Sequence, residues 1–138
     1  MLITKQVEFS ASHVCRIDRL SDEENTRIFG AAANPHGHGH NYLLDVTLEG
    51  WPDPVTGMVM DLKELKDTLN REVIDPFDHR FLNLEVSPFD RVIPTAENIA
   101  VEIWRRLAKA IPAGRARLHS VRLFETSDLY VEYFGEDE

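Results

Sequence analysis

Two histidines separated by one glycine, His38 and His40, are the residues of this 138-residue chain that most clearly suggest chemistry. In an extended strand, residues two apart point to the same face, so the two imidazoles are expected to project side by side. Imidazole is a good zinc ligand, and Gly39 would let the backbone come close to an ion. Either the pair binds a metal, or it is only a polar strand end.

A third imidazole is available at the end of the segment Phe9-Ser10-Ala11-Ser12-His13. Alternate residues of this segment are apolar, so His13 is expected to end the buried face of a strand. Three neutral imidazoles leave one tetrahedral zinc position open, which is typical of catalytic rather than structural sites. The spacing therefore predicts a metal site formed by His13, His38 and His40.

Four further residues could carry chemistry. Glu125 follows two apolar residues on the same strand face, where an unpaired carboxylate is costly to bury. It either lies at a strand end in solvent or binds the donor groups of a ligand. Asp78 and His79 form an adjacent acid–imidazole pair in an irregular stretch. Cys15 shares the parity of His13 and is either a packed apolar residue or a nucleophile.

The elements that must position these residues can be read from periodicity and capping signals. The patterns predict four main strands at 2–14, 38–50, 115–125 and 128–135, with a short strand at 58–60. They predict helices at about 21–29, from 61 to a stop at Pro76 with Leu62 on its apolar face, and at about 96–110. The order β, β, α, α, β, β predicts one α+β domain over residues 1–138, with a four-stranded antiparallel sheet and two helices on one face.

Composition excludes several classes of protein. A formal net charge of −9 argues against a nucleic-acid groove, which needs a basic face. No apolar run approaches the roughly 20 residues of a membrane helix, so no membrane partner is expected. No secretory signal is visible at the N-terminus, and a single cysteine suits a reducing compartment. We therefore expect a cytoplasmic protein.

Ordered motifs along nearly the whole chain resemble one family, the 6-pyruvoyl-tetrahydropterin synthases and the related 6-carboxytetrahydropterin synthases. These motifs include Phe9-Ser10-Ala11-Ser12-His13, Gly37-His38-Gly39-His40-Asn41-Tyr42, Asp78-His79, Pro94-Thr95-Ala96-Glu97-Asn98 and Glu125-Thr126. The resemblance implies an enzyme that acts on 7,8-dihydroneopterin triphosphate and eliminates triphosphate. The pyruvoyl and carboxy products share the early part of this path.

The resemblance also implies roles for individual residues. They are zinc ligands His13, His38 and His40; proton-transfer residues Asp78 and His79; and pterin-binding residues Glu125, Thr95 and Glu97. The implied fold is the tunnelling fold (T-fold), whose units form a trimeric barrel that stacks into a homohexamer, a dimer of trimers. Sites in such assemblies lie between subunits.

One position departs from the family pattern. The family's usual base is a cysteine six residues before the first histidine of the His-Gly-His motif, and here that residue is Ala32. Some relatives carry a glutamate near the motif, but residues 30–34 contain none. Another group could act as the base, namely Cys15, His36 or a zinc-bound hydroxide. Alternatively, the chain binds zinc and pterin with lost or altered activity, or the alanine was introduced to trap a substrate.

Overall fold

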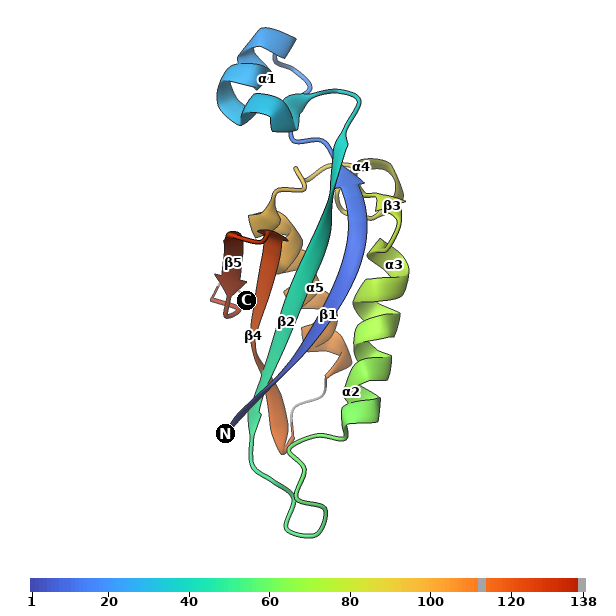
Figure 1. Ribbon diagram of the computed structural model, residues 1–138, viewed down its shortest axis with the longest axis vertical. Coiled ribbons are helices and arrows are strands. Elements are labelled where there is room, and N and C mark those ends of the chain that lie inside the picture. Colours follow the sequence, from blue (N-terminus) through green and yellow to red (C-terminus); the bar gives the residue numbers. More distant parts are fainter. Residues whose placement is uncertain (112–113, 137–138) are drawn as a thin grey trace.

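A computed structural model describes residues 1–111 and 114–136 of the chain. A long twisted sheet runs the length of the molecule, with helices on one side and a small helical excursion at one end (Figure 1). The strand order is β3-β1-β2-β4-β5. The strands are β1 (Leu2–His13), β2 (His38–Gly50), β3 (Arg80–Phe81), β4 (Ala116–Thr126) and β5 (Leu129–Tyr133).

The expected four-stranded antiparallel sheet is therefore wrong in one respect, because the sheet has five strands and is mixed. The additional strand, β3, is two residues long and runs parallel to β1 beside Ala11 and Ser12. The expected strand at 58–60 does not form. There the chain turns back on itself, and the Asp53 backbone N–H donates to the carbonyl oxygen of Met58 at 2.8 Å. Backbone groups that are hydrogen-bonded within this turn cannot pair with a neighbouring strand.

The two faces of the sheet differ in polarity, as period-two alternation predicts. One face is buried and carries Tyr42, Leu44, Val46 and Leu48 from β2, together with Phe9, Val121 and Leu123 from its neighbours. The other face carries polar side chains that hydrogen-bond across strands, including Thr4 with Thr47, Gln6 with Asp45, and Ser10 with Asn41.

Two main helical segments cover the buried face. Helix α5 (Ala96–Ala110) begins at its N-cap Thr95, and the stripe Ile99, Ile103 and Leu107, which has the spacing of one helix face, is fully buried. Helix α2 (Leu62–Leu69) begins at its N-cap Asp61 and buries Leu65 and Leu69. Leu62 was expected on the same face but is 64% exposed, because the first turn of α2 extends beyond the core.

The helical segment that begins with α2 ends at Phe77, one residue after the expected stop at Pro76, but it is not one continuous α-helix. A π-helical turn, η2 (Asn70–Ile74), follows α2 and leads into α3 (Asp75–Phe77), which contains the proline. Proline has no N–H to donate, and its ring clashes with the carbonyl group four residues earlier. The wider π turn accommodates this break, since the Asp75 N–H donates to the carbonyl oxygen of Asn70, five residues earlier.

Short helices complete the chain at the end of the sheet. Helix α1 (Asp22–Phe29) begins with a capping box between Ser21 and Glu24, and is followed by η1 (Gly30–Ala33). Helix α4 (Leu82–Glu85) follows β3. Within the described residues, no helix has the length and apolar character needed to cross a membrane.

Candidate metal and ligand site

Three histidines converge at the end of the buried face of the sheet. The candidate ligand nitrogens of His13, His38 and His40 all lie within 4.8 Å of one another. The Nε2 atoms of His13 and His38 are 3.0 Å apart. The structure thus brings together the three residues that spacing alone selected, in an arrangement that could hold one metal ion.

Strand register explains this convergence. β1 and β2 are antiparallel, with His13 opposite His38 and Ala11 opposite His40. Ala11 has a small side chain, which leaves room above it for the imidazoles. A side chain at Gly39 would lie 3.1 Å from the Ala11 carbonyl oxygen, so glycine permits the close approach of the two strands.

The hydrogen bonding of His13 fixes which nitrogen faces the other two rings. Its Nδ1 lies 2.7 Å from the Pro94 carbonyl oxygen, which can only accept, so Nδ1 carries the proton and donates. The Nε2 lone pair is therefore left for a metal. Metal-bound histidines commonly donate their other ring nitrogen to such a partner.

The electrostatics favour a neutral imidazole at His13 and at His40. Burial lowers the pKa of His13 to about 4; His38 and His40 act in the same direction, and the bond to Pro94 opposes them. Burial also lowers the pKa of His40, and this effect outweighs the nearby Glu125 carboxylate, which raises it. Neutral imidazole is the form that binds a metal, so no proton has to be displaced near neutral pH.

A cavity of about 270 Å³ opens beside the histidines. It gathers residues that are far apart in sequence, and Glu125 reaches to 3.9 Å from His40, measured from Oε1 to Nε2. Its lining consists of His13, Cys15, Ile28, Phe29, Ala32, His38, Thr95, Ala96, Glu97, Glu125 and Leu129. The predicted pterin-binding residues therefore share one cavity with two of the predicted metal ligands.

Ala32 and Cys15 lie next to each other in this cavity. The Cys15 backbone N–H donates to the Ala32 carbonyl oxygen at 2.9 Å. Burial, with smaller contributions from Glu125 and Glu97, raises the pKa of the Cys15 thiol to about 11, so the thiol is protonated at neutral pH. His36, the other candidate for a substitute base, is exposed and does not line the cavity.

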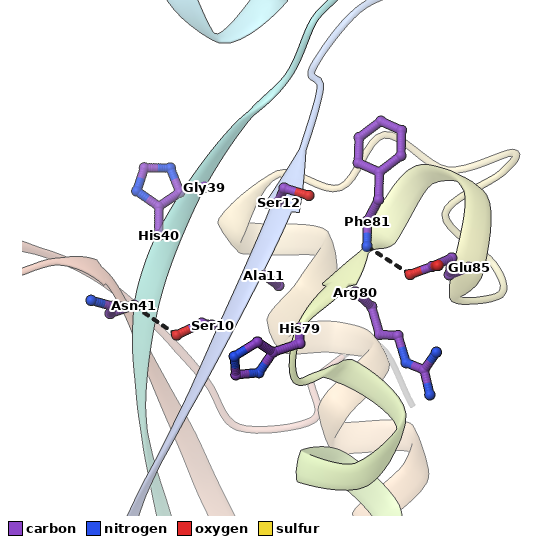
Figure 2. Close-up of a pocket in the computed structure, with 10 residues that line it drawn as sticks. All are labelled: Ser10, Ala11, Ser12, Gly39, His40, Asn41, His79, Arg80, Phe81 and Glu85. Atoms are coloured by element: carbon purple, nitrogen blue, oxygen red, sulfur yellow. Dashed lines mark hydrogen bonds between the residues drawn. The ribbon is translucent and has the colours of Figure 1, made fainter.

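Asp78 and His79 do not lie in this cavity. They hold the outer edge of β1, where the Ser10 N–H donates to Asp78 Oδ1 at 2.8 Å and the His79 N–H donates to the Ser10 carbonyl oxygen at 2.6 Å. The second carboxylate oxygen, Oδ2, lies 3.0 Å from His79 Nδ1. The imidazole, 82% exposed, borders a second cavity of about 560 Å³, which Ser10, Arg80 and the third clustered histidine, His40, also line (Figure 2).

The charge of Asp78 is expected to contribute to stability in a pH-dependent manner. Hydrogen bonds from the Ser10 N–H and from His79 hold the pKa of this carboxyl below its usual 3.8. A carboxyl whose pKa is lower in the folded state stabilises that state above the unfolded pKa, and the contribution is lost as pH falls through the folded pKa. Wild type should therefore exceed Asp78→Asn in urea-unfolding free energy at pH 7 by more than at pH 3. A difference that is constant with pH would contradict this.

Several groups at the site were not predicted from sequence. The Pro94 carbonyl that orients His13 is a backbone group with no side-chain signature. Asn83 behaves like a strand partner of Val14, since its amide accepts from the Val14 N–H at 2.8 Å and donates to the Val14 carbonyl oxygen at 2.9 Å. This clamp fixes the backbone directly after His13. An asparagine in a short helix gives no such signal by itself.

Comparisons with known proteins agree with these features. A profile of the family described as 6-pyruvoyl tetrahydropterin synthase matches residues 2–136. The chain is 46% identical over 134 residues to the 6-pyruvoyl tetrahydrobiopterin synthase of Pongo abelii, covering 97% of this chain and 91% of the relative. It is 37% identical over 130 residues to the dihydroneopterin monophosphate aldolase of Pyrococcus furiosus, covering 94% of each.

A solved structure gives the same result. The 6-pyruvoyl tetrahydropterin synthase of Caenorhabditis elegans matches with a TM-score of 0.91 at 36% identity, covering 99% of this chain and 96% of that one. The similarity therefore extends over nearly the whole chain in both sequence and fold.

Proposed function

Because the chain belongs to the 6-pyruvoyl tetrahydropterin synthase family and has its tunnelling fold, we propose that it is a zinc-dependent pterin synthase. Its substrate would be 7,8-dihydroneopterin triphosphate, from which triphosphate is eliminated. The observation that carries the proposal is one cavity lined both by two of the three clustered imidazoles and by the Glu125 carboxylate. We place the reaction in the cytoplasm.

The residues present fit a zinc ion. His13, His38 and His40 supply three nitrogen donors, and within the described residues the buried atoms His38 Nδ1 and His40 Nε2 have no hydrogen-bond partner. Bound zinc would act as a Lewis acid on the oxygens of the substrate side chain, acidifying the adjacent C–H. The protein's part is to keep the imidazoles neutral and oriented.

Glu125 would anchor the pterin ring. Its side chain is only 20% exposed, and a carboxylate can accept two parallel hydrogen bonds from the ring N–H and amino donors. Thr95 and Glu97 line the same cavity at the start of α5 and would contact the ring from another side.

Asp78 and His79 would act in proton transfer. The carboxylate holds the Nδ1 side of the ring, which leaves Nε2 of the exposed imidazole to exchange a proton with substrate. Since the pair lies outside the histidine cavity of its own chain, we propose that it completes the site of a neighbouring copy.

An assembly of this kind also suits the open edges of the sheet. β3 pairs with β1 at Ala11 and Ser12, and Asp78 and His79 bond the backbone of Ser10. Within the described residues, the outer edge of β1 before Ser10 has no strand partner, and β5 is the opposite edge strand. Joining copies edge to edge into a closed barrel would cover both edges. We expect a homohexamer, a dimer of trimers, in solution. Light scattering coupled to gel filtration checks this, and a monomer at all concentrations would contradict it.

A second candidate follows from Ala32, whose methyl group lines the cavity where relatives carry a base. A methyl group cannot abstract a proton, so the chain could bind zinc and pterin without turnover. Product analysis on 7,8-dihydroneopterin triphosphate with added zinc separates the two candidates. Elimination of triphosphate supports the synthase. Tight binding with unchanged substrate supports the binding protein, and a cleaved pterin would indicate an aldolase-type reaction instead.

Removing the charge of Glu125 tests the pterin anchor in both candidates. Glu125→Gln preserves the shape of the side chain but replaces one carboxylate oxygen, an acceptor, by an NH2 donor. Pterin affinity is therefore expected to fall by about 10-fold to 100-fold, which corresponds to the loss of a charge-assisted hydrogen bond. Fluorescence titration with neopterin measures it. Glu132→Gln, on β5 and paired with Arg122, is the matched control and should bind normally. Equal affinity in the two variants would contradict the assigned role.

A further inference from the structure

Tyr42 has a hydroxyl group that the fold does not use. The residue is fully buried on β2, and within the described part of the chain its hydroxyl has no hydrogen-bond partner. An unsatisfied buried donor costs about 1–3 kcal/mol, and nearly all such groups in native proteins are paired with protein or ordered water. Phenylalanine would fill almost the same volume without this cost. The hydroxyl therefore requires a partner that does not come from these residues.

The position of Tyr42 identifies where that partner would lie. It is the next residue after His40 on the buried face of β2, and its ring centroid is 5.4 Å from that of His40. β2 and β4 pair Leu44 with Leu123 and Leu43 with Phe124. Tyr42 and Glu125 are the next residues on these two strands. Burial and, secondly, the Glu125 carboxylate raise the pKa of the Tyr42 phenol, so the phenol lies near this carboxylate, which lines the cavity.

The ring itself is held firmly. It stacks on Phe9 with the ring centroids 5.0 Å apart and the planes inclined by 16°, and it meets the ring of His13 edge-on at 6.2 Å. A phenol ring that is packed on both sides holds its hydroxyl oxygen at one position. The donor is preorganised, so binding an acceptor there requires little further ordering.

We propose that the Tyr42 hydroxyl is a ligand-binding group of this site, donating a hydrogen bond to an acceptor oxygen held beside Glu125. The oxygen comes from the bound pterin substrate, or from an ordered water that remains in the ligand-free protein. The first case rests on the proposed function; the second does not.

Tyr42→Phe in the full-length, zinc-loaded protein tests the proposal. Tyr133→Phe is the matched control, because it removes a hydroxyl from the same sheet at a ring that packs on Trp104, away from the histidines. Two readouts are needed: the dissociation constant for neopterin by fluorescence, and the thermal midpoint without ligand. If the substrate supplies the oxygen, Tyr42→Phe weakens neopterin binding about fivefold to tenfold, which is the usual effect of losing one neutral hydrogen bond. Tyr133→Phe leaves neopterin binding unchanged.

If water supplies the oxygen, Tyr42→Phe lowers the ligand-free thermal midpoint relative to wild type and leaves neopterin binding unchanged. A crystal structure would then show the water within hydrogen-bond distance of the hydroxyl. Unchanged affinity with an equal or higher midpoint would overturn the proposal. Failure of the wild type to bind neopterin would count against the proposed function alone, and the midpoint would then decide the role of Tyr42.

Discussion

Replacing His13 with alanine is expected to lower zinc affinity by more than 100-fold. His13 supplies one of three clustered donors and is the one whose orientation is fixed by a backbone carbonyl. Losing a group that only supports a ligand already costs about 10-fold to 100-fold in metal affinity, so losing a ligand should cost more. Competition titration with a chromogenic chelator measures the effect, and the cobalt-substituted protein should lose its visible spectrum.

His36→Ala is the matched control for that experiment. His36 is two residues before His38 but is exposed and does not belong to the cluster. The His36→Ala variant should bind zinc with the affinity of the wild type. Equal zinc affinity in His13→Ala and His36→Ala would show that the three imidazoles are not the metal site.

Introducing a thiol at position 32 is expected to raise turnover of 7,8-dihydroneopterin triphosphate by about 100-fold to 10,000-fold, the usual contribution of a positioned general base. Ala32 lines the histidine cavity, so a cysteine there would reach the same space as the substrate. The buried Cys15 thiol next to it is held protonated by its raised pKa and is a poor substitute. Steady-state assay of triphosphate release, with zinc content measured in parallel, gives the comparison.

Ala31→Cys provides the control for Ala32→Cys. Ala31 is the preceding residue of η1 but is exposed and does not line the cavity. Its thiol should leave turnover unchanged. If Ala32→Cys is no faster than Ala31→Cys while the unmodified chain is active, then the base lies elsewhere in the assembly.

Local periodicity predicted much of the fold correctly. The row His38, His40, Tyr42 and Leu44 follows from alternation within one strand, and the buried stripe of α5 follows from helical spacing. The T-fold itself came from the resemblance. β3 was missed because two residues carry no periodic signal and pair with β1 only through the packing of the whole chain. The turn at Met58, which replaces the expected strand at 58–60, likewise gives no periodic signal in the sequence.

The candidate site was predictable to a different extent. Strand parity placed His38 and His40 on one face, but only the register of β1 against β2 brings His13 opposite them. The spatial separation of Asp78 and His79 from the histidine cavity could not be read from motif order. Neither could the unpaired hydroxyl of Tyr42, since satisfaction of a donor depends on every group packed around it. The roles assigned to these residues stay predictions.

The π turn before Pro76 has a consequence for the direction of the residues that follow it. Each α-helical residue rotates the helix by about 100°, so winding the same residues, Asn70–Ile74, as uninterrupted α-helix would rotate Asp78 by roughly that angle. The carboxylate would then turn away from Ser10, and His79 would lose its support. An uninterrupted α-helix would therefore misplace the Asp78–His79 pair, whereas the π turn keeps the pair directed toward β1.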